Sequence, residues 1–411
     1  MIRLFNTLGR RAEPFRPVSK KTVNIFTCGP SVYQRAHIGN FRTFLFEDIL
    51  VRYLEYSGYT VKRGMNFTDI EDKAIREAVR KKTTVNRLTG ENIRHFLHEM
   101  KLLRMKIPDY LPKASESVDK AVKIIEKLIS LKCAYWHKGN VYFDPLTFQG
   151  FGKLFGLDMT KWPSKKKRFH KDTYPGIQWN LGDFILWHGY RKGDRYYWET
   201  KIGKGRPSWN VQDPSMIIRY FHETLSIYCG GFDNLFRHHD YILAILESFN
   251  PYPAAKYWLH CNHLSVNRQK MSKSKGNILY IDDLKSLGYT MSEIRFFLIY
   301  GQYRDRLNYS ERQMRMTVDK LRYFKDRVKS FERISRTKIA SSNPSTRSGL
   351  KNLRIENSFI QGMDNDLNVR EAFDSLHEKI SGVRMNELLP AEASGIIKVF
   401  REIDRVLQVI F

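Results

Sequence analysis

The sequence predicts an α/β fold that continues into a largely helical C-terminal part, and three observations lead to this prediction. Residues 22–28 (TVNIFTC) alternate and are rich in β-branched and aromatic side chains, as in a buried strand, and they turn into a helical pattern at residues 41–56. A second strand at residues 59–65 is followed by polar side chains, which is where open α/β sheets carry their ligand sites. Helical periodicity returns from residue 290 to the end.

The remaining elements follow from local pattern. Residues 1–20 predict a short strand, a basic turn and a lead-in to the next strand. The further expected elements are helices over 86–130 with a break at Pro108 and Pro112, a strand at 140–144, helices at 290–300 and 311–331 with three more after them, and a polar linker at 339–349. The stretch 161–173 is rich in Lys and Arg, and it predicts either an exposed loop or a contact with an RNA backbone.

The turn between the first strand and its helix has the composition of an anion site. Gly29, Pro30 and Gly39 are small or rigid residues, suited to a sharp bend and a close approach to a ligand. His37 and Asn40 stand three residues apart at the helix start, so both can project from one face at a terminus that attracts phosphate. Alone, this pattern also fits a histidine that merely caps a helix.

A second basic motif lies far downstream, in Lys270-Met271-Ser272-Lys273-Ser274. Its ammonium groups and hydroxyls in a flexible stretch suit a clamp on a triphosphate, although an isolated basic loop is usually solvated surface.

Both motifs in this order resemble the signature pair of the class I aminoacyl-tRNA synthetases. Further blocks resemble the cysteinyl-tRNA synthetase family and run collinearly from about residue 2 to about residue 385: CGPSVY at 28–33, NFTDIEDK at 66–73, DFILW at 183–187, GGFD at 230–233 and LNYS at 307–310. The resemblance implies a doubly wound, Rossmann-like parallel-sheet nucleotide domain split by an insertion and followed by α-helical domains.

The same resemblance implies a division of the chain. We expect the halves of the catalytic domain at 1–85 and 181–265, the inserted region at 86–180, the lysine loop and stem-contact region at 266–310, and a helical bundle at 311–411. The chain ends where the family's anticodon-reading domain would begin.

Site residues carry over from the family position by position. The expected catalytic residues are His37, Asn40, Lys270 and Lys273; residues lining the nucleotide are Gly29, Gly39, Gly230, Gly231, Asp233, Met271, Ser272 and Ser274; residues beside the amino acid are Cys28, Thr68 and Trp209. ATP with Mg²⁺ is the implied cofactor. A core tryptophan at 209, and an N-cap formed by Thr68 or Asp69, are the structural alternatives.

The family's zinc site is altered here. Its ligands, two cysteines, a histidine and a glutamate, fall on Cys28, Asp213, His238 and Ile242, and isoleucine cannot bind a metal. Three alternatives remain open: zinc on Cys28, Asp213 and His238 with an open position; recruitment of Cys229, His239 or Asp240; or loss of the metal, and with it the physical basis for selecting cysteine.

Composition limits the partners and the compartment. With 70 Lys and Arg against 43 Asp and Glu, the chain carries a net charge of +27, which favours a polyanion such as tRNA, although a generally basic proteome would give the same balance. Four scattered cysteines favour a reducing compartment, and the absence of an apolar spanning run excludes a membrane protein, so we expect a cytoplasmic location.

The sequence thus predicts a cysteine-tRNA ligase-like enzyme that activates an amino acid with ATP and transfers it to tRNA. Two alternatives stay open: a tRNA-independent ligase that passes the adenylate to a small amine or carrier, and a catalytically silent RNA-binding paralogue.

Overall fold

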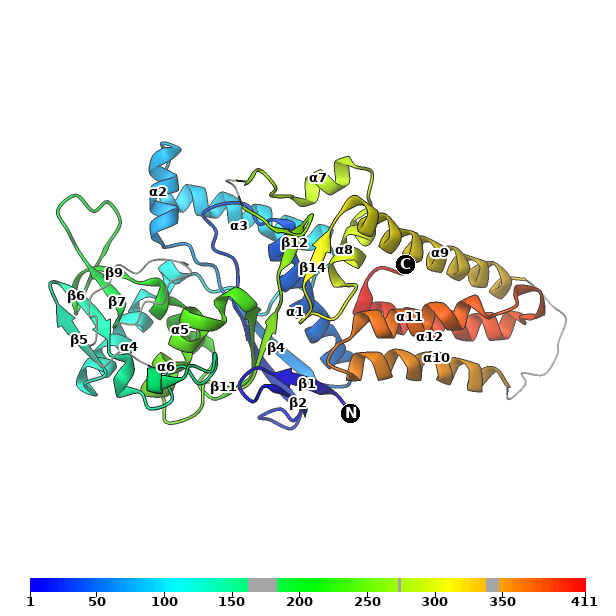
Figure 1. Ribbon diagram of the computed structural model, residues 1–411, viewed down its shortest axis with the longest axis horizontal. Coiled ribbons are helices and arrows are strands. Elements are labelled where there is room, and N and C mark those ends of the chain that lie inside the picture. The colour runs from blue at the N-terminus through cyan, green and yellow to red at the C-terminus, as the bar shows by residue number, and fades with distance from the viewer. Residues whose placement is uncertain (162–182, 273–274, 338–346) are drawn as a thin grey trace.

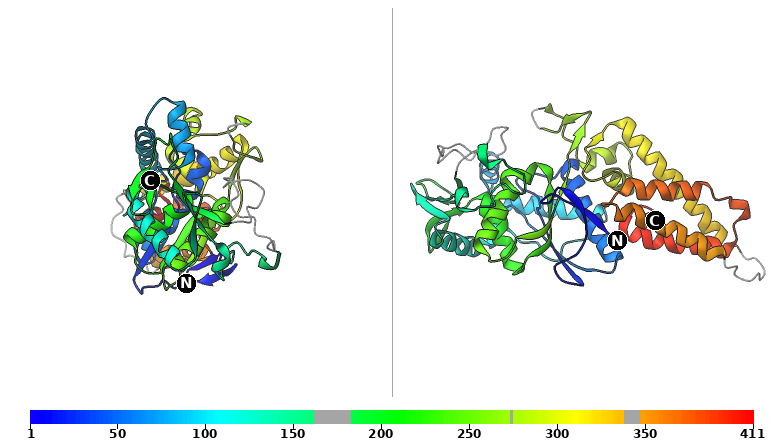
Figure 2. Two further views of the ribbon diagram at one scale, coloured as in Figure 1. Left: turned by 90° about the vertical axis from the view of Figure 1, so that its left-hand side faces the viewer. Right: turned by 60° about the horizontal axis from the view of Figure 1, so that its bottom comes forward.

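A computed structural model describes residues 1–161, 183–272, 275–337 and 347–411 of the chain. The molecule is elongated, with a parallel sheet at its centre, an inserted region at one end and a bundle of helices at the other (Figures 1 and 2). In the described ranges, no helix combines the length and the apolar character needed to cross a bilayer.

The central sheet has four strands in the order β11-β10-β3-β4, all parallel. They are β3 (Thr22–Thr27), β4 (Thr60–Met65), β10 (Leu225–Gly231) and β11 (Ala255–Cys261). Both faces are buried, because successive side chains of β10 pack into different clusters: Ile227 and Cys229 on one face, Tyr228 on the other. The predicted doubly wound parallel sheet is confirmed.

Helices cover the two faces of this sheet. Helix α1 (Ile38–Tyr56) packs against β4 and β10 on the face of Cys229, whereas α5 (Trp209–Tyr220) and α6 (Asp240–Phe249) contribute to the cluster on the face of Tyr228. The chain winds outward from β3 to β4 and from β10 to β11, so the direction reverses between the adjacent strands β3 and β10. Open α/β sheets bind ligands at the carboxyl ends of strands at such a point.

The insertion consists of helices and an antiparallel sheet. Its helices are α2 (Asp72–Arg80), α3 (Val85–Leu102) and α4 (Val118–Ser130), and its sheet has the order β5-β6-β7-β9-β8, formed by β5 (Ala134–His137), β6 (Asn140–Phe143), β7 (Phe184–Gly189), β8 (Trp198–Thr200) and β9 (Gly203–Pro207). The expected return to the nucleotide domain at residue 181 is therefore wrong, because β7 pairs with β6 and the central fold resumes only at α5.

Two smaller units frame the centre. A hairpin of β1 (Arg3–Asn6) and β2 (Arg11–Pro14) lies beside β11, and a three-stranded sheet is formed by β12 (Leu264–Val266), β13 (Gln269–Lys270) and β14 (Leu307–Tyr309). The helices that follow are α7 (Ile281–Ser286), α8 (Met291–Ile299), α9 (Glu311–Ser335), α10 (Arg347–Asp364), α11 (Val369–Ser381) and α12 (Pro390–Leu407). The predicted C-terminal helices are confirmed, although most of the expected linker at 339–349 and most of the basic stretch 161–173 lie outside the described residues.

One local expectation is wrong. Neither Thr68 nor Asp69 caps α2, whose N-cap is Glu71. The Asp69 carboxylate instead accepts hydrogen bonds from the backbone and hydroxyl of Ser115, which fastens the end of β4 to the insertion.

Candidate active site

The start of α1 holds His37 and Asn40 in a reciprocal cap. The His37 backbone N–H donates to Asn40 Oδ1 at 3.0 Å, and the Asn40 backbone N–H donates to His37 Nδ1 at 3.3 Å. Because Nδ1 accepts, the ring proton lies on Nε2, where it can be donated to an anion. Burial lowers the pKa of His37 below its ordinary value, although the Asp233 carboxylate opposes that shift, so the ring is neutral near pH 7.

The lysine loop lies against this helix start. A Cβ on Gly39 would come within 2.4 Å of Met271 Cε, and the Ile38 backbone N–H donates to the Leu279 carbonyl at 3.0 Å. Asn277 closes the loop, since its side chain accepts from the Ser272 N–H and donates to the Lys270 carbonyl. The structure thus brings the two distant motifs together, whereas Lys273 and Ser274 lie outside the described residues.

Glycines allow backbone segments to approach closely around the carboxyl ends of the strands. A Cβ on Gly29 would meet the Asn66 carbonyl oxygen at 1.9 Å, and the Gly29 N–H donates to Asn66 Oδ1 at 2.7 Å. A Cβ on Gly230 would lie 2.6 Å from His239 Cε1, and one on Gly231 would lie 2.7 Å from Asp233 Oδ1. Only glycine fits these contacts without a shift of the neighbouring groups.

A buried polar cluster lies beside Cys28, on the side expected to hold the amino acid. The Asp213 carboxylate accepts from Asn66 Nδ2 and from the Tyr228 hydroxyl, both at 3.0 Å, and its Oδ2 is 3.3 Å from His238 Nε2. Thr68 belongs to the same network, because Asn66 Nδ2 also lies 3.3 Å from Thr68 Oγ1. The carboxylate, hydroxyl, amide and imidazole groups of this cluster therefore lie next to one another in the interior of the protein, where they are shielded from water.

Trp209 and Cys28 border that cluster. The Trp209 ring stacks on His238, with centroids 3.8 Å apart and planes inclined by 6°. Burial, followed by the charge of Asp213, raises the pKa of the Cys28 thiol well above its ordinary value, so the sulfur stays protonated when no cation is near. Asn234 Nδ2 lies 3.7 Å from this sulfur.

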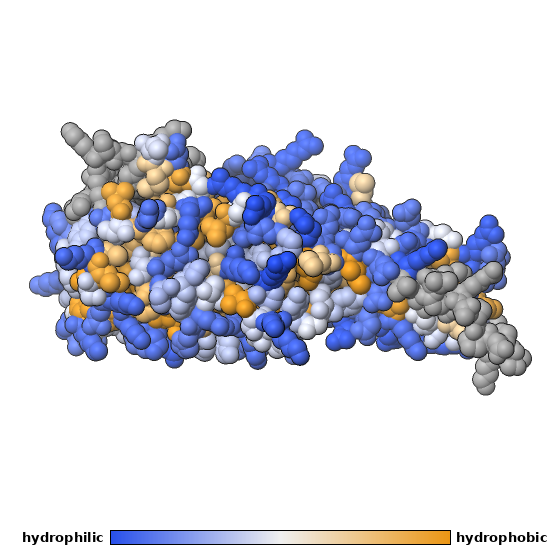
Figure 3. Space-filling view, turned by 90° about the horizontal axis from the view of Figure 1, so that it is seen from below, coloured by the Kyte–Doolittle hydropathy of each residue, from blue (hydrophilic) through white to orange (hydrophobic). Residues whose placement is uncertain are grey.

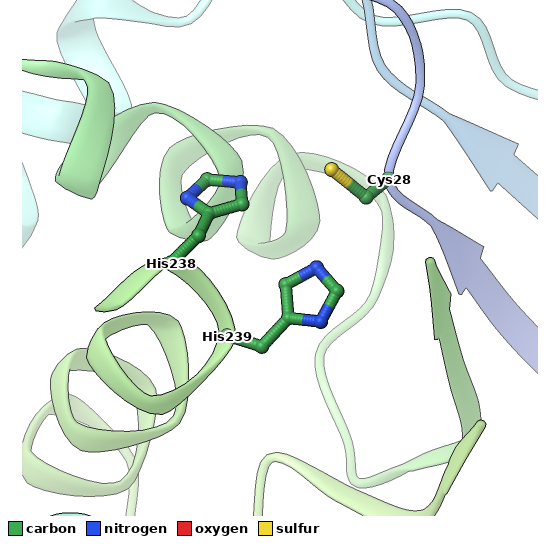
Figure 4. A group of neighbouring side chains, drawn as sticks. All are labelled: Cys28, His238 and His239. Carbon is green, nitrogen blue, oxygen red and sulfur yellow. The ribbon is translucent and has the colours of Figure 1, made fainter. Parts of the chain in front are cut away.

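The four positions implied for zinc do not form a complete ligand set. Ile242 is fully buried hydrocarbon. Of the three residues considered as replacements, Cys229 packs on the opposite face of β10, and Asp240 accepts the backbone N–H groups of Leu154 and Phe155. His239 is different, because it lies with Cys28 and His238 in a buried group whose donor atoms are all within 4.8 Å of one another (Figure 4). A zinc ion fits this changed set.

Sequence reasoning gave no role to two residues that build the site. Asn66 orients both Gly29 and Asp213, and Tyr228 donates to Asp213. Asn66 follows a predicted strand at its carboxyl end, which was a usable signal. Tyr228 carried no such signal, since an aromatic residue inside a strand ordinarily indicates packing.

Comparisons with known proteins agree with this geometry. Residues 14–319 match the family model described as tRNA synthetases class I (C) catalytic domain. A cysteine-tRNA ligase of Chlamydia pneumoniae is 34% identical over 413 residues, which cover 99% of this chain and 86% of the relative. A cysteine-tRNA ligase of Brachyspira hyodysenteriae is 35% identical over 382 residues, covering 92% and 80%.

Solved structures support the fold. The Mycobacterium tuberculosis methionyl-tRNA synthetase in complex with methionyl-adenylate superposes with a TM-score of 0.65 at 13% identity, covering 94% of this chain and 89% of that one. The match over residues 14–319 and the relatives that span nearly the whole sequence show that the chain belongs to the class I tRNA synthetases whose catalytic domain is of the (C) type.

Proposed function

We propose that this protein activates cysteine with ATP to form cysteinyl adenylate and transfers the cysteinyl group to tRNA. The contact between Gly39 and Met271 carries the proposal, because it places the capped start of α1 and the lysine loop around one space at the carboxyl ends of the strands. Two phosphate-binding elements that are distant in sequence have little reason to meet unless they share a nucleotide.

The residues have distinct roles in the proposed activation step. The amino-acid carboxylate attacks the α-phosphate of ATP, which forms the adenylate and releases pyrophosphate. His37 Nε2–H and the N-terminus of α1 stabilise phosphate charge, while Asn40 fixes the His37 ring. Lys270 and Lys273 offset the charge on the departing pyrophosphate, with Mg²⁺ bound to ATP. Positioning and charge stabilisation suffice, and no covalent enzyme intermediate is required.

The nucleoside and the amino acid occupy opposite sides of the strand ends in this proposal. Gly231 and Asp233 line the adenosine at the end of β10. Gly230, expected to line it as well, adjoins Cys28 and His239 at the position of its absent side chain, so it borders both sides. The amino acid lies towards Cys28 and Trp209, beside the buried polar cluster. A zinc ion on that side would supply a soft Lewis acid for the substrate thiol, which distinguishes cysteine from serine.

A basic hollow next to the lysine loop suits the tRNA. It has a volume of about 670 Å³, lies between the turn after β12, strand β14 and helix α9, and is lined by Arg268, Arg312 and Lys320 among other residues. The net charge of +27 adds a general attraction for a polyanion. Figure 3 shows hydrophilic residues over much of one face of the molecule, including the helical end. We propose the cytoplasm as the compartment, because all four cysteines are free thiols.

The experiment is pyrophosphate exchange with each of the twenty amino acids, followed by charging of total tRNA. We expect exchange with cysteine and transfer of radiolabelled cysteine to tRNA. A protein that supports exchange with no amino acid contradicts the enzymatic proposal. Exchange with cysteine without transfer to tRNA contradicts the assignment of the acceptor.

A further inference from the structure

Two consecutive histidines and one cysteine face one another in the interior of the molecule. The donor atoms of Cys28, His238 and His239 all lie within 4.8 Å of one another, and the three residues are buried. Figure 4 shows a ring nitrogen of each histidine turned towards the Cys28 sulfur. In a regular helix, neighbouring residues point about 100° apart, so this convergence needs a local cause.

The cause is a break in the chain just before the histidines. Phe236 and Arg237 have non-helical backbone angles inside the segment η5 (Leu235–His239), and Arg237 adopts φ of +70°. A non-glycine residue in that region costs roughly 1–3 kcal/mol and persists only where its surroundings enforce it. The break lets His238 and His239 enter the same space before α6 begins.

His239 has one nitrogen fixed and the other unpaired. Its Nδ1 lies 2.8 Å from His260 Nε2, and His260 Nδ1 lies 2.8 Å from Thr7 Oγ1. Its Nε2 is buried and has no hydrogen-bond partner among the described residues. A histidine whose second nitrogen is held by an outer partner is the usual arrangement of a metal ligand, whereas an unpaired buried nitrogen is otherwise costly.

His238 is held from two sides. Trp209 stacks on its ring, and its Nε2 lies 3.3 Å from Asp213 Oδ2. The Asp213 carboxylate therefore borders the space between the donors and supplies negative charge to a cation there. Ile242, one helical turn beyond His238, contributes only hydrocarbon.

Gly230 keeps the space open. A Cβ at this position would lie 2.6 Å from His239 Cε1, 3.0 Å from His239 Nε2 and 3.3 Å from Cys28 Cβ. The backbone of β10 thus approaches two of the donors as closely as a glycine allows.

We propose that Cys28, His238 and His239 bind one zinc ion, with His239 replacing the donor that Ile242 cannot supply and Asp213 as the neighbouring negative charge. One sulfur and two imidazole nitrogens form a donor set that zinc favours, and three protein ligands leave a coordination position open. Metal binding by these residues does not depend on the enzymatic activity. The use of the open position by a substrate thiol rests on the proposed function.

Metal content and cobalt spectroscopy test the proposal on the full-length protein. Elemental analysis of protein purified without chelator should find about one zinc per chain, and replacement by Co²⁺ should give the near-ultraviolet absorption of a cobalt-thiolate bond. Cys28→Ser should abolish that absorption, and His239→Gln should abolish stoichiometric binding. His260→Gln should weaken binding roughly 10- to 100-fold, because it removes only the outer partner.

Matched controls separate loss of a ligand from loss of the fold. Cys133→Ser and His222→Gln remove the same side-chain types outside the group and should leave metal content and absorption unchanged. Added zinc should raise the melting temperature of the wild type and of these controls but not of His239→Gln. A chelated His239→Gln variant that melts like the chelated wild type is folded, so its loss of binding is specific.

Two results would overturn the proposal: wild-type protein that neither contains zinc nor gives cobalt-thiolate absorption, or His239→Gln protein that binds zinc as tightly as the wild type. Neither result depends on pyrophosphate exchange. An active enzyme without metal would contradict this inference alone, and a zinc-binding protein without exchange would contradict the proposed function alone.

Discussion

The methyl group of Met271 lies against Gly39, so closely that a Cβ at position 39 would approach it to 2.4 Å. Gly39 lies in the first turn of α1, and its backbone does not need the left-handed conformation that glycine favours. The absence of a side chain at Gly39 therefore makes room for the lysine loop and also for the His37 ring, whose Cε1 and Nδ1 would each lie 3.1 Å from that Cβ. A substitution of Gly39 should therefore lower the activity of the enzyme without lowering the stability of its fold.

Gly39→Ala should reduce the rate of pyrophosphate exchange roughly 10- to 100-fold, because it displaces the loop from the start of α1. Alanine in a helix is favoured over glycine by about 1 kcal/mol, so the free energy of unfolding should stay equal or rise. The measurements are exchange kinetics and urea denaturation.

Met271→Ala, alone and combined with Gly39→Ala, completes a double-mutant cycle. The smaller side chain at position 271 should restore part of the exchange rate that Gly39→Ala loses. Full activity of Gly39→Ala would contradict the proposed contact.

A substitution of Trp209 should weaken the binding of the amino acid and not that of the nucleotide, since Trp209 stacks on His238 beside Cys28. A stacked aromatic pair contributes about 0.5–1.5 kcal/mol beyond its buried area, so Trp209→Ala should raise the KM for cysteine about 2- to 10-fold. The KM for ATP should not change. Trp209→Phe keeps a ring on His238 and is the matched control, with a smaller effect. An equal rise in both KM values would place Trp209 in the general packing of the site.

Local patterns predicted much of the fold but less of the site. The strand at β3, the turn and helix α1 depend on neighbouring residues, so their side-chain pattern was sufficient. The end of the insertion was placed too early, because β7 belongs to its sheet through pairing with β6, which is more than 40 residues earlier in the chain. Strand pairing at that distance leaves no local signal.

His239 shows why the site was harder to predict than the fold. Its inward position depends on the φ of +70° at Arg237 and on the hydrogen bond to His260, a residue on strand β11. Neither feature has a pattern in the sequence, since arginine does not favour that conformation. Cys28 and His238 were identified through the family resemblance, and His239 was one of three alternatives for the missing donor, of which the fold brings only His239 beside them.

Glu71 should make the protein less stable as the pH rises. It is 7% exposed, accepts a hydrogen bond from the Ser31 hydroxyl, and burial raises its pKa from 4.5 to about 7, with Lys73 opposing the shift. Between pH 4.5 and 7 the folded protein holds a proton that the unfolded chain has released. The free energy of unfolding should therefore fall across this window, by at most about 3 kcal/mol from this group.

Glu71→Gln removes that proton while keeping an acceptor for Ser31. The difference in unfolding free energy between pH 4.5 and pH 7.5, measured by urea denaturation, should be smaller in the variant than in the wild type. Glu126→Gln, on the exposed face of α4, is the control and should leave the difference unchanged. A variant whose stability changes with pH as much as that of the wild type shows that Glu71 is ionised in the folded state.

Substitutions in the basic hollow beside the lysine loop should impair the charging of tRNA and leave the activation of the amino acid unchanged. Arg268 and Arg312 line it and are exposed. If each contacts a phosphate, the double variant Arg268→Ser/Arg312→Ser should bind tRNA more weakly, and the slope of log affinity against log salt concentration should fall by about 2. Pyrophosphate exchange should keep its wild-type rate.

The double variant Lys123→Ser/Lys132→Ser removes the same charge from the insertion, so it controls for the general attraction of a protein with a net charge of +27. Equal losses of tRNA affinity in the two double variants would mean that net charge, and not this hollow, attracts the tRNA.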